Sequence, residues 1–302
     1  MVRVQVLGRN LFLLIAASVG IASAYGQALI PINTEALEAR SWIARRELDT
    51  GDLNTALKHA QEIQQLCQQA AAGRRIDEDP HLATALGAAF EVQAQSLDKL
   101  HQKTEAVQLL QNAIAKWAGT SIEARLQKNL NLLTLTGKPL PVIRSTEWIG
   151  SHAPPNKAAL PGKVVLVFFW AHWCPDCKAE APVLERLAAK LEPRGLVVIA
   201  PTARYGYTPR NENAPPAEEK AFIEQVFSRF YSAIPQVSVP LDNSNFERFG
   251  ASTTPTLVLT DRRGIVRLYH PGYMDEAALE SAIDHLLTPA PQTGRTVHSA
   301  SR

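Results

Sequence analysis

Two cysteines, Cys174 and Cys177, are separated by two residues, and this C-x-x-C spacing is suited to thiol–disulfide exchange. Pro175 follows the first cysteine and fits the first position of a helix, where a backbone N–H would be unpaired in any case. A helix N-terminus carries partial positive charge and free N–H groups, and both favour a thiolate over a thiol. We therefore expect Cys174 to be an exposed thiol at a helix tip and Cys177 to lie one turn inside the helix.

The flanking segments predict a strand, a turn and a helix around this pair. Residues 164–170 form an apolar run rich in β-branched and aromatic residues, which is typical of a strand buried on both faces and is too short to cross a membrane. Apolar residues then recur at helical spacing at Cys177, Ala181, Leu184, Ala188 and Leu191. A second buried strand is expected at 196–200, and the strand–helix–strand order predicts a parallel pair with a right-handed crossover.

The segment from Phe169 to Lys178, Phe-Trp-Ala-His-Trp-Cys-Pro-Asp-Cys-Lys, resembles the active-site signature of the thioredoxin superfamily. It is similar in particular to the TlpA/ResA-like branch of periplasmic thiol–disulfide oxidoreductases. Pro182 stands where that family has a kinking proline in the active-site helix. Thr254-Pro255-Thr256 resembles the cis-proline loop that faces the cysteines. The resemblance extends from about Val142 to Leu287, roughly half the chain.

The resemblance implies an α/β thioredoxin-like fold, with a central mixed sheet flanked by helices. It also implies a redox-active disulfide and a mechanism. The Cys174 thiolate would attack a substrate disulfide, and Cys177 would then resolve the mixed disulfide and release reduced substrate. A purely structural disulfide is the alternative, but it would need no facing proline. We expect no cofactor and no metal, because a zinc site needs about four ligands and only His172 lies nearby.

Glu180 is the candidate proton acceptor for Cys177, since the ResA-like branch has an acidic residue three positions past the second cysteine. This role needs a carboxyl that is partly buried and has a raised pKa. The alternative is an exposed glutamate in the first turns of the helix. Many thioredoxins carry an aspartate six residues before the first cysteine, but this chain has Phe168 there. Glu180 or water must then take the proton.

Three residues are candidates for substrate contact. A cis Pro255 would let Thr254 offer its backbone N–H and C=O to a substrate strand. Trp173 is expected at the rim of the site, whereas Trp170 is expected in the core. These roles are implied by the resemblance.

Two polar neighbours of the cysteines could adjust their chemistry. A protonated His172 would raise the thiolate content of Cys174, although we favour a solvated histidine with no such role. Asp176 should disfavour the thiolate slightly, which argues against a strongly oxidising protein.

Length and composition indicate two domains and exclude some partners. The chain has 302 residues, 46% hydrophobic residues and a net charge of +2. Its length predicts two hydrophobic cores, and its small net charge gives no reason to expect a nucleic-acid partner. Residues 1–28 are predicted to be a signal peptide, with a basic start, a short apolar stretch and small residues at its end. An uncleaved membrane anchor is the alternative. Export places the protein in the periplasm or another extracytoplasmic compartment, where disulfides persist.

Residues 29–136 are predicted to be an all-α domain. Segments 51–57 and 101–107 resemble each other and the second helix of a tetratricopeptide-type repeat, but their alanines lie 50 residues apart rather than about 34. The domain is therefore either a partner-binding helical repeat or a bundle that packs on the redox domain. Asp52 is a candidate N-cap. Cys67 lies on an apolar stripe and is expected to be buried and inert, rather than a resolving or intermolecular thiol.

The remaining boundaries follow from proline and glycine. Residues 137–141 are predicted to be a linker, 142–288 the thioredoxin-like domain and 289–302 a disordered tail. A short hairpin is expected within 142–162. Segment 201–216 is long for a loop and is expected to be either a rim over the site or a solvated insertion; we favour the rim.

These observations predict an exported thiol–disulfide oxidoreductase that reduces protein disulfides, as TlpA/ResA-like proteins do in cytochrome maturation. Its partners would be protein substrates and an upstream electron donor. One alternative is a disulfide donor or isomerase with the same residues. Another is a partner-binding scaffold whose redox site is secondary.

Overall fold

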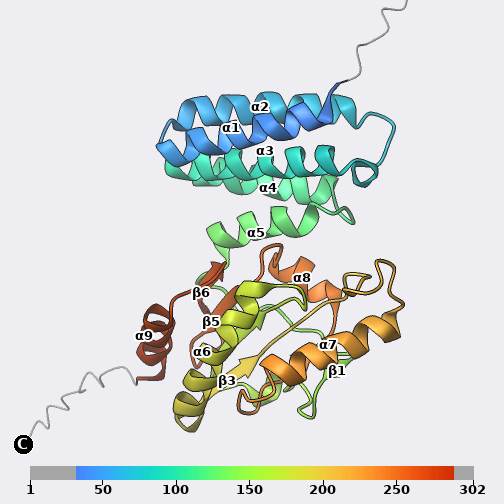
Figure 1. Cartoon of the computed structure of the whole chain (residues 1–302). Helices are drawn as coiled ribbons and strands as arrows, with labels where there is room; N and C mark the ends of the chain where they lie inside the picture. Colours follow the sequence, from blue (N-terminus) through green and yellow to red (C-terminus); the bar gives the residue numbers. More distant parts are fainter. Residues whose placement is uncertain (1–31, 289–302) are drawn as a thin grey trace, which may run out of the picture. The chain divides into compact units, whose positions relative to one another are not determined.

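The structure is a computed structural model, and it describes residues 32–288. Helices fill the first half of this range (Figure 1). Their order is α1 (Thr34–Thr50), α2 (Leu53–Ala70), a 3-10 turn η1 (Ile76–Glu78), α3 (Pro80–Lys99), α4 (Lys103–Lys116) and α5 (Glu123–Thr134). The predicted cap of α2 is confirmed, since Asp52 Oδ1 accepts the N–H of Thr55 at 3.3 Å. The two repeat-like segments form the starts of α2 and α4, but a tetratricopeptide repeat stays a prediction.

Helix α3 is the centre of this helical region. It packs against α1, α2, α4 and α5, and it buries side chains around nearly its whole circumference. Small residues permit this, because alanines fill many of the buried positions and let neighbouring helices approach closely. Cys67, on α2, is fully buried as predicted, and burial raises the pKa of its thiol to about 12.

The second half of the described chain is an α/β domain built on a four-stranded sheet (Figure 1). Its elements are β1 (Trp148–Ile149), η2 (Lys157–Ala159), β2 (Val164–Phe169), α6 (Pro175–Leu191), η3 (Glu192–Arg194), β3 (Leu196–Ile199), α7 (Pro216–Phe230), β4 (Val239–Pro240), α8 (Asn243–Phe249), β5 (Thr256–Thr260), β6 (Val266–Pro271) and α9 (Glu276–Leu287). The sheet order is β3-β2-β5-β6. Strands β2 and β3 are parallel, and the other neighbours are antiparallel. This is the mixed sheet that was expected.

Strand β2 is buried on both faces because its alternate side chains enter two different cores. Leu166 and Phe168 join the core that contains residues of α6, α7 and α9. Phe169 instead contacts Phe246 and Phe249 of α8, with ring centroids 5.2 and 5.0 Å apart. The continuous apolar run is thus explained by helices on both sides of the sheet.

The pairing of β2 with β5 brings distant parts of the chain together. Phe169, the last residue of β2, pairs with Thr256, the first residue of β5. The cysteine pair follows β2 and Pro255 precedes β5, so this register places the proline loop beside the cysteines.

The predicted hairpin within 142–162 is wrong. Strand β1 pairs with β4 instead, with Trp148 opposite Pro240 in an antiparallel register. Prolines at 154, 155 and 161 have no backbone N–H to donate, so the segment that follows β1 is poorly suited to a returning strand.

The segment expected to be a linker, 137–141, is bonded to the redox domain. The N–H of Gly137 donates to the carbonyl of Val266 at 2.8 Å, and the N–H of Val266 donates to the carbonyl of Lys138 at 2.8 Å. Residues 33–288 belong to one compact unit, and Asn131 of α5 donates to the carbonyl of Phe249 in α8 at 2.8 Å. The helical and thioredoxin-like regions are therefore in contact.

The predicted signal peptide and C-terminal tail lie outside the described residues. Between residues 32 and 288, no helix is both long and apolar enough to span a bilayer.

Candidate active site

The two cysteines lie at the N-terminus of α6, as predicted. They form a disulfide, with their Cα atoms 5.4 Å apart. Cys174 is the N-cap residue, and its Sγ accepts the N–H of Cys177 at 3.1 Å. Pro175 opens the helix, where its missing N–H costs no hydrogen bond. The same N–H and helix dipole can stabilise negative charge on Cys174 when the disulfide is reduced.

The expectation that Cys174 is exposed is wrong for this disulfide form. Its exposed fraction is only 1%, although its neighbour Trp173 is 45% exposed at the rim, as predicted. The proline loop covers the sulfur, since Sγ lies 3.5 Å from the carbonyl oxygen of Thr254. The sulfur of Cys174 is therefore shielded from solvent in this form.

The proline loop has the expected backbone geometry. The peptide bond between Thr254 and Pro255 is cis. Thr254 presents its carbonyl towards Cys174, and its hydroxyl is buried without a hydrogen-bond partner in the structure. Thr254 is thus the loop residue that faces the disulfide.

Glu180 meets the structural conditions for a proton acceptor. It is fully buried one turn past Cys177, and neither carboxyl oxygen has a hydrogen-bond partner. Burial raises the pKa of this carboxyl to about 7, and the charge of Asp176 contributes in the same direction. Phe168, six residues before Cys174, is fully buried and has no acid group to take this proton.

The expectation of a solvated His172 is also wrong. His172 is 1% exposed, and its Nε2 lies 3.2 Å from Oε1 of Glu219, which is equally buried. Burial lowers the pKa of His172, and the Glu219 carboxylate opposes that shift. The rings of Tyr205, Tyr207 and Phe222 surround the imidazole edge-on at 5.3–5.6 Å between centroids. The histidine is buried because the insertion after β3 folds over it.

Glu219 is a site residue that sequence reasoning missed. Besides contacting His172, its carboxylate accepts the N–H groups of Tyr205 at 2.5 Å and Gly206 at 2.9 Å. It therefore ties α7, the insertion and the active-site turn together. A glutamate in the first turn of a helix is common, so nothing local in the sequence marks this role.

The insertion lies at the rim of the site. Tyr205 packs edge-on against Trp173, with ring centroids 5.5 Å apart. Trp170, by contrast, is fully buried as predicted and donates its indole N–H to the carbonyl of Ala200 at 2.9 Å. The aromatic residues of 201–216 are thus part of the surroundings of the cysteines.

The site can exchange two electrons between a dithiol and a disulfide, with a buried carboxyl available for the proton. Residues 32–288 contain no group of three or more His, Cys, Asp or Glu side chains arranged to hold a metal ion.

The second half of the chain is similar in sequence to known thioredoxin-like proteins. Residues 155–287 match the thioredoxin-like domain family. The thiol:disulfide interchange protein DsbE of Xylella fastidiosa is 28% identical over 166 residues, which are 52% of this chain and 75% of that protein. The thiol-disulfide oxidoreductase ResA of Halalkalibacterium halodurans is 26% identical over 125 residues, 41% of this chain and 63% of that protein. The crystal structure of a putative DsbE from Chlorobium tepidum aligns with 27% identity and a TM-score of 0.39, covering 51% of this chain and 98% of that one.

Proposed function

This chain carries a thioredoxin-like domain and is a thiol–disulfide oxidoreductase, and from that premise we propose that it reduces protein disulfides through Cys174 and Cys177. The observation that carries the proposal is the disulfide at the N-terminus of α6. Cys174 Sγ caps that helix and lies against the Thr254 carbonyl. A structural disulfide would not need this placement.

The reaction begins with the reduced dithiol. The Cys174 thiolate attacks one sulfur of the substrate disulfide, which forms a mixed disulfide and expels the other substrate sulfur as a thiolate. Cys177 then loses its proton and attacks Cys174 Sγ. The Cys174–Cys177 bond forms, and the second substrate sulfur leaves as a thiolate. The substrate gains two electrons and the protein loses two.

Glu180 would accept the proton of Cys177 in the second step. A carboxyl with a pKa of about 7 is matched to proton transfer near neutral pH. The helical position supports this role, because residues three apart lie on the same face of a helix.

The direction and location of the reaction form the finer part of the proposal. We assign the protein as an exported reductant, in a process such as cytochrome maturation. Asp176, close to Cys174 in the sequence, disfavours the thiolate and so disfavours a strongly oxidising disulfide. A disulfide donor or isomerase would use the same residues with the opposite electron flow.

The reduction potential distinguishes the two directions. It is measured by equilibrating the protein with glutathione redox buffers, quenching with acid and reading the disulfide content from intact mass. A value close to that of thioredoxin, about −270 mV, is expected for a reductant, whereas a value near about −120 mV would identify a disulfide donor. Cys67→Ala is the matched control, since this buried cysteine should not affect the potential. A scaffold role would instead be supported if Cys174→Ser protein still rescued a deletion phenotype.

A further inference from the structure

Helix α1 has two opposite faces of different character (Figure 1). Its inward face is buried, at Leu37, Ser41, Ala44 and Leu48. Its outward face carries four exposed residues with the same spacing, displaced by two positions: Glu35, Ala39, Trp42 and Arg46. Two positions correspond to about 200° around a helix, so these four residues lie directly opposite the buried ones. This outward face is not covered by any part of residues 32–288.

The outward face of α1 is unusually apolar for a solvated surface. Trp42 is 67% exposed, more than any other large apolar side chain among the described residues, and Ile43 beside it is 57% exposed. The exposed positions of the neighbouring helix α2 are instead all polar, at Asn54, Lys58, Gln61, Gln65 and Gln69. Tryptophan is enriched among the residues that dominate binding at protein interfaces. The face therefore has the composition of a contact surface.

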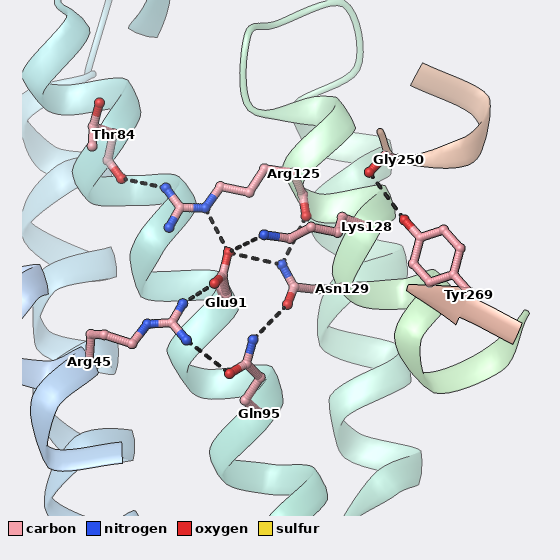
Figure 2. Close-up of polar contacts among 9 residues, drawn as sticks. All are labelled: Arg45, Thr84, Glu91, Gln95, Arg125, Lys128, Asn129, Gly250 and Tyr269. Carbon is pink, nitrogen blue, oxygen red and sulfur yellow. Dashed lines mark hydrogen bonds and ion pairs between the residues drawn. The ribbon is translucent and has the colours of Figure 1, made fainter. Parts of the chain in front are cut away.

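The inward side of α1 is held by buried polar contacts. Arg45 donates to Glu91 of α3 and, at 3.0 Å, to Oε1 of Gln95 (Figure 2). Glu91 is almost fully buried and also accepts from Arg125 of α5 at 2.8 Å. A buried carboxylate that lost these partners would remain desolvated, so the orientation of α1 is fixed. Its exposed apolar side chains therefore cannot turn into the core of their own chain.

Two charged residues of the outward face lack a partner within residues 32–288. Other charged side chains of α1 are paired, Arg40 with Glu62 and Glu47 with His59. Glu35 and Arg46 are exposed on either side of the apolar patch and make no ion pair in this range. They are eleven positions apart, which is about 17 Å along a helix, so they cannot pair with each other.

We propose that this face is the contact between two copies of the chain, with their α1 helices antiparallel about a two-fold axis. In such a contact, residue i of one copy meets residue j of the other, and j meets i. In one antiparallel register, Glu35 lies opposite Arg46 of the second copy. The same register sets the small side chain of Ala39 against the large ring system of Trp42. The spacing of four, three and four residues is also that of a coiled-coil seam.

Charge complementarity favours a second copy over other occupants of this face. The same helix supplies an arginine for Glu35 and a glutamate for Arg46, so both charges are satisfied at once. The two charges cancel, so they give no net attraction to an anionic membrane surface. A pair of 17-residue helices is a small contact beside standard interfaces, which bury roughly 800 Å² per partner. We therefore expect a weak dimer, with a Kd of about 1–100 µM.

The test is sedimentation velocity of the purified protein from about 1 to 300 µM, which should show the wild type passing from one copy to two. Glu35→Arg and Arg46→Glu should each raise Kd about 10-fold, because each creates two like-charge contacts in the symmetric dimer. The combined variant, Glu35→Arg with Arg46→Glu, should return Kd to within about threefold of the wild-type value, since both pairs are again opposite in sign. Glu105→Arg is the matched control and should leave Kd unchanged, because Glu105 is an exposed acid in the first turn of α4.

Trp42→Ala should raise Kd by at least about 30-fold, as expected for a tryptophan at the centre of an interface. Circular dichroism and denaturation midpoints verify that every variant is folded. A wild-type protein that remains a single copy over the whole range would overturn the proposal. So would a dimer that Trp42→Ala leaves unchanged, or charge reversals that the combined variant does not rescue. None of these results depends on whether the cysteines reduce a disulfide, so a failure of the proposed function would be seen separately.

Discussion

Replacing Glu180 with Gln should change how the stability of the oxidised protein depends on pH. In the unfolded chain the carboxyl titrates near its ordinary pKa of 4.5, whereas in the folded protein burial raises this pKa to about 7. Between these values the folded state holds one proton more than the unfolded state. The free energy of unfolding of the wild type therefore falls as pH rises through this window. Glutamine has no proton to bind, so the variant lacks this contribution.

The size of the effect follows from the shift. One pKa unit corresponds to about 1.4 kcal/mol, so a rise from 4.5 to about 7 amounts to at most about 3.5 kcal/mol. Water penetration and local relaxation would reduce that figure. The buried amide that Glu180→Gln introduces would add its own cost of about 1–3 kcal/mol at every pH. The two proteins will therefore differ in free energy of unfolding at every pH. The informative result is how much that difference changes as pH rises.

The assay is urea denaturation of wild type and Glu180→Gln, both oxidised, from pH 4 to pH 8. Oxidation keeps Cys174 and Cys177 from titrating, and every other group is common to both proteins. Between pH 4 and pH 8, we expect the free energy of unfolding of Glu180→Gln to rise by about 2–3 kcal/mol relative to that of the wild type. Most of this relative rise should fall between the two pKa values. Parallel curves over this range would show that Glu180 is ionised and solvated in the folded protein. The proton-acceptor role would then lose its basis.

Other predictions concern kinetics, burial and packing. Glu180→Gln should slow the attack of Cys177 on the mixed disulfide by about 10²-fold, which is the low end for loss of a general base. The rate of this step, measured by stopped flow, should also depend less on pH near neutrality. Cys67 should resist alkylation until the protein unfolds, because it is fully buried and its thiol pKa is about 12; labelling of the native protein would contradict this. Glu219→Gln should destabilise the protein by about 1–3 kcal/mol and speed amide exchange at Tyr205 and Gly206, because a neutral amide accepts those N–H groups less well; unchanged exchange would refute the anchoring role. Gly250→Ala should destabilise the protein more than Gly51→Ala does: both have positive φ, but only the Cβ at position 250 would meet backbone atoms. Equal losses in denaturation would show that α5 is not packed tightly there.

The fold was predictable where the chain pattern is local and continuous. The apolar run of β2, the C-x-x-C pair and the helical spacing after it adjoin one another, and all three lie where they were expected. The pairing of β1 was missed because it depends on β4, which lies far along the chain at Val239–Pro240. No local signal specifies a two-residue strand.

Sequence motifs predicted those site residues that are part of a recognisable local pattern. The resemblance indicated Cys174, Cys177, Glu180 and the proline loop. The structure places the Thr254 carbonyl 3.5 Å from Cys174 Sγ and buries Glu180 one turn past Cys177. The resemblance did not indicate that Cys174 is covered, because that depends on how closely the Thr254 loop approaches.

The environment of His172 required knowledge of tertiary contacts. Its carboxylate partner lies 47 residues away on α7, and the tyrosines around it come from an irregular insertion. Neither segment has a pattern that points back to the cysteines. The contact of α5 with α8, by contrast, was foreseen as one of two alternatives, the bundle that packs on the redox domain.

The central claim, that Cys174 attacks a substrate disulfide and Cys177 resolves the product, is tested most directly by trapping the intermediate. Reduced Cys177→Ala protein is mixed with a peptide disulfide, quenched with acid, digested without reductant and mapped by mass spectrometry. The account predicts a stable mixed disulfide between the peptide and Cys174, which is absent from Cys174→Ser protein. A peptide linked to Cys67, or no adduct at all while the wild-type protein reduces the same peptide, would contradict it.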